Sequence, residues 1–155
     1  MADDIESLRT VADYQFGPGA GVALFPRDGE VSVTRTSSGR LRQIHADGDR
    51  LGTYEQDGRI RLGIEGGSRL QDGLDSGGYR VVVGDESEPF VRDGKNAFAK
   101  FVTGADGAIR PRDEVLLEHE DGRLLAVGRA ELSGQGMLDF ETGMAVQVRD
   151  TIGSA

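Results

Sequence analysis

The sequence contains no cysteine and no tryptophan, and only two of its 155 residues are lysine. Without cysteine the chain can form neither a disulfide nor a thiolate zinc site, and it has no thiol nucleophile. No apolar run approaches the roughly 20 residues that would span a bilayer, and the first residues are acidic where a signal peptide would be basic. These absences predict a cytoplasmic protein that makes no contact with a membrane.

Positive charge is also scarce. Asp and Glu number 27 against 18 Lys and Arg, which gives a formal net charge of -9. Such a preference for acids over lysine suits a protein kept soluble in strong brine, although acidic mesophilic proteins share it, and we predict a halophilic source. Acidity normally argues against a nucleic-acid partner. At molar salt, however, the Debye length is only about 3 Å, so distant carboxylates would repel a phosphate much less.

The first half of the chain has the pattern of a helix followed by a meander. Apolar side chains at helical spacing predict a helix from Asp3 to about Tyr14. Short alternating runs between Val31 and Ile64 predict antiparallel strands, and a second short helix is expected from Gly66 to Leu74. The cluster from Asp75 to Gly78 then predicts a boundary. The two domains defined in this way are residues 1–77 and 78–153.

Two motifs in this half resemble ligand loops, and in each case a turn is the better interpretation. The run Gly17–Gly21 suggests a phosphate loop, but no strand precedes it and no Lys-Ser/Thr follows it. Asp47 and Asp49 suggest a calcium loop, but the later oxygen ligands and the glutamate at the twelfth position are missing. We therefore predict no metal and no cofactor.

The second half is organised around the stretch from Glu88 to Phe101. Pro89 suits the first turn of a helix, and Gly94 supplies a helix stop. The apolar run Ala97–Val102 then predicts a strand. Three cations lie around this junction of helix and strand, which is unusual in so acidic a chain: Arg92, Lys95 and Lys100.

Further short strands follow at regular spacing, with a short helix that Ser133 can cap and that extends to Phe140. Six short strands with turns between them predict a small closed or nearly closed barrel from about Tyr79 onward. The fold class predicted for the whole chain is α+β: a helix packed on an antiparallel meander, followed by a β-barrel.

Several motifs of the second half resemble the PUA domain, an RNA-binding module. They are Gly94-Lys95, the strand with Lys100, Arg112–Val115, Val127–Ala130 and Gly143–Val146. One departure is visible, because the usual Gly-Asp before the central strand is here Arg112-Asp113. The resemblance covers residues from about Tyr79 to Arg149 and implies a PUA barrel.

The first half is similar to the domain that precedes the PUA module in archaeal tRNA-guanine transglycosylases and archaeosine synthases. The motifs are Val11–Gly17, Gly19–Gly21, Leu24-Phe25 and Thr36–Arg42. In those transglycosylases a barrel of about 250 residues performs base exchange with a carboxylate nucleophile, and this chain leaves no room for one. The resemblance therefore implies a tRNA-binding part without catalytic residues.

The resemblance also nominates RNA-binding residues, since the PUA groove lies between the first helix, the strand after it and the closing strand. Carried over by position, these are Arg92, Lys95, Asn96, Lys100, Arg129 and Arg149. A cluster around a hairpin tip of the first domain could also reach RNA, namely Arg35, Arg40 and Arg42. The alternative is that these cations balance neighbouring carboxylates, as surface charges usually do.

Other conspicuous side chains have simpler interpretations. Phe16 is expected to be a buried aromatic that closes the first helix, and Phe98 and Phe101 are expected in the core rather than on a stacking surface. His45 and His119 have no partner histidine nearby, so both are expected to be ordinary surface residues. Asp113 and Glu114 are adjacent, and alternation on a strand would point them to opposite faces, which makes a poor acid/base couple.

Together these observations predict a non-catalytic RNA-binding protein whose first candidate ligand is tRNA or another structured RNA. A rival interpretation is a protein-interaction subunit that docks on a separate tRNA-guanine transglycosylase or archaeosine synthase chain. A third, a small enzyme, would need a convergent set of titratable residues that the sequence does not display.

Overall fold

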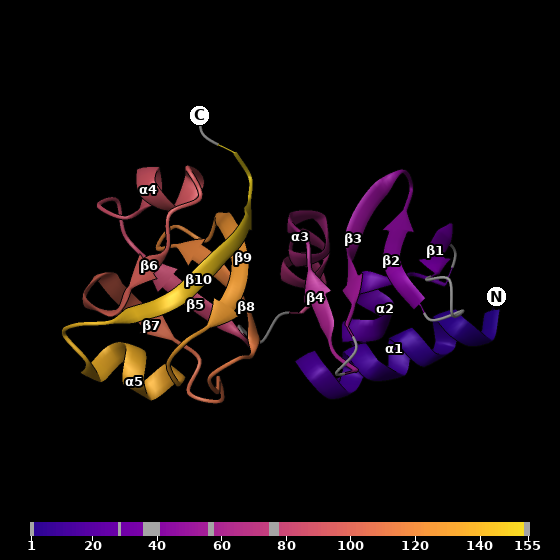
Figure 1. Ribbon diagram of the computed structural model, residues 1–155, viewed down its shortest axis with the longest axis horizontal. Helices are drawn as coiled ribbons and strands as arrows, with labels where there is room; N and C mark the ends of the chain where they lie inside the picture. The colour runs from indigo at the N-terminus through magenta and orange to yellow at the C-terminus, as the bar shows by residue number, and fades with distance from the viewer. Residues whose placement is uncertain (1, 28, 36–40, 56–57, 75–77, 154–155) are drawn as a thin grey trace. The chain divides into compact units, whose positions relative to one another are not determined.

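The computed structural model describes residues 2–27, 29–35, 41–55, 58–74 and 78–153 (Figure 1). The chain divides into two compact units, residues 1–76 and 77–155, and each unit is described by itself. Both combine helices with a mainly antiparallel sheet, which confirms the α+β class. Among the described residues, no helix is both long and apolar enough to cross a membrane.

The first unit places three helices against a four-stranded antiparallel meander. The helices are α1 (Ala2–Phe16), α2 (Ala20–Leu24) and α3 (Ile64–Gly73). The strands are β1 (Val31–Arg35), β2 (Leu41–Ala46), β3 (Asp49–Tyr54) and β4 (Ile60–Leu62), paired in the order β1-β2-β3-β4. The predicted helix on a meander is therefore confirmed, with α2 as an addition.

The core of this unit follows from the apolar spacing of α1. Leu8, Ala12 and Phe16 recur on one helix face and are all buried, and Phe16 closes the helix as expected. They share the buried core with sheet residues such as Ile44 and Leu51.

Helix α2 was not anticipated, because its five residues are too few to show a period. Gly19 precedes it with φ 94°, and the N–H of Gly21 donates to Oδ1 of Asp13 at 2.7 Å. The absence of a side chain at Gly21 also matters, since a Cβ there would lie 2.4 Å from the carbonyl oxygen of Arg9. The glycine run is thus a turn that lets α2 pack directly on α1.

The second unit contains a six-stranded sheet with two short α-helices. Its strands are β5 (Arg80–Val83), β6 (Ala97–Phe98), β7 (Val102–Ala105), β8 (Glu114–His119), β9 (Leu124–Ala130) and β10 (Met144–Thr151). Its helices are α4 (Glu88–Arg92), the 3₁₀ helix η1 (Ala99–Phe101) and α5 (Gly134–Asp139). Ser133 caps α5 as predicted, since its Oγ accepts from the N–H of Gly136 at 2.9 Å.

The strand order β6-β10-β9-β8-β5-β7 explains why this sheet nearly closes. Strands β6 and β7 form its two edges, yet only the three residues of η1 separate them along the chain. The two edges must therefore come close together, as in a barrel (Figure 1). The predicted PUA-type barrel is confirmed.

One detail of the prediction was wrong. The run Ala97–Val102 was expected to be a single strand, but η1 interrupts it at Ala99. The N–H of Ala99 donates to the carbonyl of Gly143 at 2.9 Å, and the side chain of Ala99 is buried. The chain must leave one edge of the sheet here and join the other, and the 3₁₀ turn makes this corner.

Candidate nucleic-acid interface

Helix α4 and the segment after it hold the nominated cations of the second unit. Pro89 occupies the first turn of α4, and Gly94 follows with φ 91°, a left-handed conformation that ends the helix. The N–H of Lys95 donates back to the carbonyl of Phe90 at 2.9 Å, which fixes the exit of the chain. Lys95 therefore sits at a well-defined corner between α4 and β6.

The two lysines differ from the nominated arginines in their electrostatic surroundings. Both Lys95 and Lys100 are exposed, and within the described part of the chain neither forms an ion pair with a carboxylate. Nζ of Lys100 lies 5.0 Å from the centroid of the Phe101 ring, within the range of a cation–π contact. These two ammonium groups remain available to an anion.

The nominated arginines of this unit are held by carboxylates. Nη1 of Arg92 lies 3.1 Å from Glu88, and Nη2 of Arg129 lies 3.1 Å from Glu131. Two further candidates also have structural contacts. Arg149 pairs with the buried Glu114, and Oδ1 of Asn96 accepts from the N–H of Val148 at 3.0 Å. Their predicted part in RNA binding remains a prediction.

The three candidates of the first unit cannot be compared as a group. Arg35 ends β1 and is exposed. Arg40 and the side chain of Arg42 lie outside the part that the structure describes. The expected basic hairpin tip therefore also remains a prediction.

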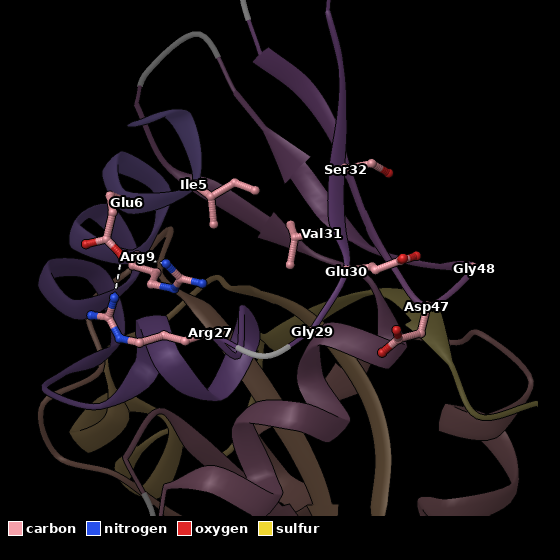
Figure 2. A pocket seen from close by; sticks show the side chains of 10 residues that line it. All are labelled: Ile5, Glu6, Arg9, Arg27, Gly29, Glu30, Val31, Ser32, Asp47 and Gly48. Carbon is pink, nitrogen blue, oxygen red and sulfur yellow. Dashed lines mark hydrogen bonds and ion pairs between the residues drawn. The ribbon is translucent and has the colours of Figure 1, made fainter. Parts of the chain in front are cut away.

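A pocket of about 680 Å³ in the first unit lies between α1 and the turns beside β1 (Figure 2). Ile5 and Val31 give it an apolar floor, and its rim is lined by charged residues: Glu6, Arg9, Arg27, Glu30 and Asp47.

The two arginines of this rim are already engaged. Nη1 of Arg27 lies 2.8 Å from Glu6, and Nε of Arg9 donates to the carbonyl of Phe25 at 2.7 Å. The hydrogen bond from Arg9 also holds the pKa of Glu6 below its usual value. With three acids against two paired arginines, this pocket does not attract a phosphate.

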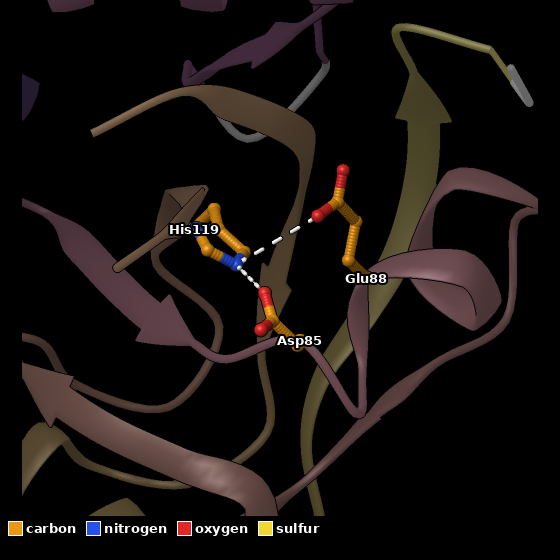
Figure 3. Close-up of side chains that lie close together, drawn as sticks. All are labelled: Asp85, Glu88 and His119. Carbon is orange, nitrogen blue, oxygen red and sulfur yellow. Dashed lines mark hydrogen bonds and ion pairs between the residues drawn. The ribbon is translucent and has the colours of Figure 1, made fainter. Parts of the chain in front are cut away.

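The expectation that His119 is an ordinary surface residue was wrong. His119 is buried, and its Nε2 lies 2.6 Å from Oδ1 of Asp85 and 3.7 Å from Glu88 (Figure 3). The Asp85 hydrogen bond raises the pKa of His119 above its usual value, against the opposing effect of burial. His45, by contrast, is partly exposed and lies 3.4 Å from the side chain of Gln43.

Around His119 runs a network that ties α4 to the turn between β8 and β9. Both Glu88 oxygens accept from Arg123 at 2.9 Å, and Nε of Arg123 lies 2.7 Å from Asp121. The hydrogen bond from Arg123 lowers the pKa of Glu88. The backbone and side-chain N–H groups of Arg123 lower that of Asp121. The network therefore anchors the helix that precedes Lys95.

The ligand atoms of Asp85, Glu88 and His119 lie within 4.8 Å of one another, which raises the question of a metal. The hydrogen bonds argue against it. The N–H of Asp121 donates to Nδ1 of His119 at 3.0 Å, so in the neutral ring the proton is on Nε2, where a metal would bind. Because Arg123 also occupies both oxygens of Glu88, this donor set does not fit a cation.

The adjacent acids Asp113 and Glu114 make separate contacts. Oδ2 of Asp113 accepts from the N–H of Arg110 at 2.9 Å, whereas Glu114 pairs with Arg149. They do not form an acid/base couple.

Sequence reasoning missed the burial of His119 and the exposure of Phe98. Strand β8 lies inside the sheet between β5 and β9, and all six of its residues are buried, so alternation gave no signal. Phe98 was expected in the core, which is wrong, because 47% of its surface is exposed on the edge strand β6. Only the edge position could have indicated this.

The fold agrees with the families that the two halves match. Residues 6–76 match the patch-forming domain C2 of tRNA-guanine transglycosylase, and residues 79–152 match the PUA domain. The first half of the chain therefore matches a C2 domain and the second half a PUA domain, and the resemblance predicted from the sequence is confirmed.

Relatives named tRNA-guanine(15) transglycosylase are similar to nearly the whole chain. The one from Methanothermobacter thermautotrophicus is 45% identical over 95% of this chain, and the one from Pyrococcus furiosus is 50% identical over 92%. The chain spans only 22% and 24% of these two proteins, less than a quarter of their length.

Two solved structures share the architecture. A hypothetical protein from Pyrococcus horikoshii superposes with a TM-score of 0.77 at 25% identity, covering 97% of this chain and 91% of that one. A PUA-domain structure from Aeropyrum pernix, with a TM-score of 0.73 and 20% identity, covers 100% of this chain and 85% of that one and shows the fold alone.

Proposed function

We propose that this protein binds structured RNA, with tRNA as the first candidate, and that it does so without catalysing a reaction. The observation that carries the proposal is the state of the two lysines in the PUA unit. Lys95 and Lys100 are exposed and form no ion pair among the described residues, while neighbouring arginines are held by acids. Exposed lysines without a carboxylate partner, in a chain with a net charge of -9, favour a polyanion as ligand.

The similarity to proteins named tRNA-guanine(15) transglycosylase supports tRNA over other polyanions. The matched part of those relatives is less than a quarter of their length, and it consists of a C2 and a PUA domain. Lys95 and Lys100 would contact phosphates and set the register of the RNA. We expect a smaller contribution from Arg92, Arg129 and Arg149, since each would have to leave a carboxylate first.

The experiment is a fluorescence titration of the full chain with a labelled tRNA transcript across a range of potassium chloride concentrations. Phosphate contacts make the logarithm of the binding constant fall linearly with the logarithm of the salt concentration. Lys95→Gln and Lys100→Gln should each weaken binding and reduce that slope by about one. A salt-independent interaction, or none at all, would overturn the proposal.

Arg110→Gln is the matched control for charge alone. Arg110 is an exposed cation in the turn before β8, and its side chain makes no ion pair within the described residues. If Arg110→Gln changes the slope as much as Lys95→Gln does, the binding reflects overall charge and not a site. The same titration, extended above 1 M salt, tests the predicted halophilic behaviour.

A second function, docking on a catalytic transglycosylase chain, is favoured by one observation. The relatives are more than four times as long as the part that this chain matches. Size-exclusion chromatography of this chain mixed with the remaining part of such a relative tests it. RNA binding that appears only in the mixture would favour docking over direct RNA recognition.

A further inference from the structure

The sheet of the first unit has an open edge at β1. The strand order β1-β2-β3-β4 pairs β1 with β2, and no strand of the described residues pairs with its other side. The N–H of Asp47 donates to the carbonyl of Glu30 at 3.4 Å, which continues the register of Val31 opposite Ala46. Hydrogen-bonded and non-hydrogen-bonded pairs alternate along an antiparallel ladder. The N–H and C=O groups of Val31 and Val33 therefore face the open edge.

The apolar face of β1 is only partly covered. Val31 and Val33 lie opposite Ala46 and Ile44, which are buried, so these side chains share the core face of the sheet. The two valines are nevertheless only half-buried. The pocket of about 680 Å³ between α1 and β1 lies against Val31, with Ile5 on its other side (Figure 2). Apolar surface is thus open to solvent directly beside the edge-facing backbone groups.

The charges around this pocket are unevenly compensated. On the α1 side, Glu6 pairs with both Arg9 and Arg27. On the β1 side, Asp47 has an ion-pair partner on α3, but 62% of its side chain is exposed. Glu30 is exposed and forms no ion pair within the described part of the chain. The pocket therefore presents one uncompensated carboxylate next to its apolar floor.

We propose that this groove is a docking site for an extended segment of another protein, which carries a Lys or Arg next to an apolar side chain. The segment adds to β1 as a fifth strand, and its backbone pairs with the edge-facing groups of Val31 and Val33. Its apolar side chain lies on Ile5 and Val31, and its cation meets Glu30. The inference goes beyond the proposed RNA binding and does not depend on it.

The features of the groove argue against other occupants. A helix cannot pair with an open strand edge, because its own N–H and C=O groups already bond to each other. A polyanion would meet Glu30 while Arg9 and Arg27 are both engaged. A second copy of this chain has the same net charge of -9, so charge complementarity disfavours it.

The test titrates the ¹⁵N-labelled full chain with two synthetic heptapeptides, one that alternates valine with lysine and one with glutamate in place of lysine. The lysine peptide should shift the amide NMR signals of Val31 and Val33 in a saturable way. The glutamate peptide should bind at least about tenfold more weakly. A lysine peptide whose edge-facing amides are N-methylated cannot donate to the strand and should also lose about tenfold in affinity.

Glu30→Gln should weaken binding of the lysine peptide by about threefold, since it removes the carboxylate without changing the edge. Glu65→Gln is the matched control. Glu65 is an exposed acid of α3 that does not line the pocket and forms no ion pair among the described residues. It should leave the peptide affinity unchanged.

Three results would overturn the docking site: equal affinity for the lysine and glutamate peptides, saturable shifts centred outside β1, or no shifts at millimolar peptide. Shifts at β1 that depend on the concentration of the chain alone would assign the edge to a second copy and overturn it as well. Glu30→Gln should bind tRNA like the wild type in the salt titration. Failure of the docking site therefore leaves the RNA-binding proposal standing, and failure of RNA binding leaves the docking site standing.

Discussion

The imidazole of His119 donates from Nε2 to Oδ1 of Asp85 across 2.6 Å, joining the end of β8 to the loop that enters α4. In the neutral ring Nδ1 accepts from the N–H of Asp121, whereas in the protonated ring it can donate to Oδ1 of Asp121, which lies 3.1 Å away. The carboxylates of Asp85, Glu88 and Asp121 all lie within 4 Å of this ring. A buried histidine surrounded in this way connects the stability of the PUA unit to pH.

We expect the unit to become less stable as the pH rises from about 6.5. The folded-state pKa of His119 is raised, chiefly by the hydrogen bond with Asp85, so the protonated ring is favoured in the folded protein. The stabilisation is complete below the unfolded-state pKa of about 6.5 and is lost as the pH rises through the higher folded-state value. Urea unfolding between pH 5.5 and 8.5 measures this trend.

His119→Gln should remove that pH dependence, because glutamine does not titrate. His45→Gln is the control, since His45 is the other histidine of the chain and lies in the first unit. It should leave the trend as it is in the wild type. A wild-type stability that does not change between pH 6 and 8 would contradict the proposed role of His119.

At acidic pH a second group of the same network should dominate. The hydrogen bonds from Arg123 lower the pKa of Glu88 below its usual value of about 4.5. Stability from Glu88 is therefore present above pH 4.5 and is lost as the pH falls through the folded-state pKa. Glu88→Gln should lower stability at pH 7. It should also make the loss of stability below pH 4.5 less steep.

Circular dichroism melts between pH 2.5 and 7 measure this effect. Glu86→Gln provides the control, because Glu86 is exposed in the loop that enters α4 and none of the described ion pairs includes it. If stability falls equally steeply with decreasing pH in the Glu88→Gln and Glu86→Gln variants, Glu88 is not the titrating group.

The features that depend only on neighbouring residues in the chain, such as the ends of helix α4, were predicted correctly. Pro89 and Gly94 mark the limits of α4, and the glycine at Gly94 is needed for its φ of 91°. The break at Ala99 could not be predicted in the same way, because its cause is the carbonyl of Gly143 in a distant part of the chain. Only the closure of the sheet brings these two residues together.

The candidate RNA-binding site likewise has some features that the local sequence predicts and others that depend on contacts between distant residues. The scarcity of lysine directed attention to Lys95 and Lys100, and both prove to be exposed. Which arginines are neutralised could not be predicted, since Arg149 and Glu114 lie 35 residues apart and meet only across the sheet. The exposed Phe98 was missed for a related reason, because apolar runs do not reveal which strand forms an edge.

Close backbone packing in the first unit makes Gly66 intolerant of any side chain. A Cβ at Gly66 of α3 would lie 2.2 Å from the carbonyl oxygen of Leu51 in β3. Alanine gains about 1 kcal/mol of helix propensity over glycine, but overpacking against a backbone atom costs about 1–3 kcal/mol. We expect Gly66→Ala to destabilise the unit in urea unfolding.

Gly107→Ala is the comparison variant, because a Cβ at Gly107 would meet no atom within 4 Å. That substitution should change stability by less than about 0.5 kcal/mol. A Gly66→Ala variant as stable as Gly107→Ala would mean that α3 does not pack so closely on β3.

The ion pair between Glu114 and Arg149 should contribute mainly to folding, and Arg149 should contribute only slightly to RNA affinity. Glu114 is 7% exposed and Arg149 26% exposed, whereas the pair of Arg129 and Glu131 is 41% and 30% exposed. Removing one partner of a buried pair leaves a charge without compensation and costs about 3 kcal/mol, while an exposed pair contributes about 0.5 kcal/mol. Glu114→Gln should therefore destabilise the unit far more than Glu131→Gln does.

Urea unfolding of the two single variants tests this difference, and the double variant Glu114→Leu/Arg149→Met sharpens it. Replacing both charges with apolar groups removes the cost of leaving one charge unpaired. The double variant should therefore be more stable than Glu114→Gln and should bind tRNA only slightly more weakly than the wild type. A double variant that folds well but loses tRNA binding would instead assign Arg149 a direct contact with RNA.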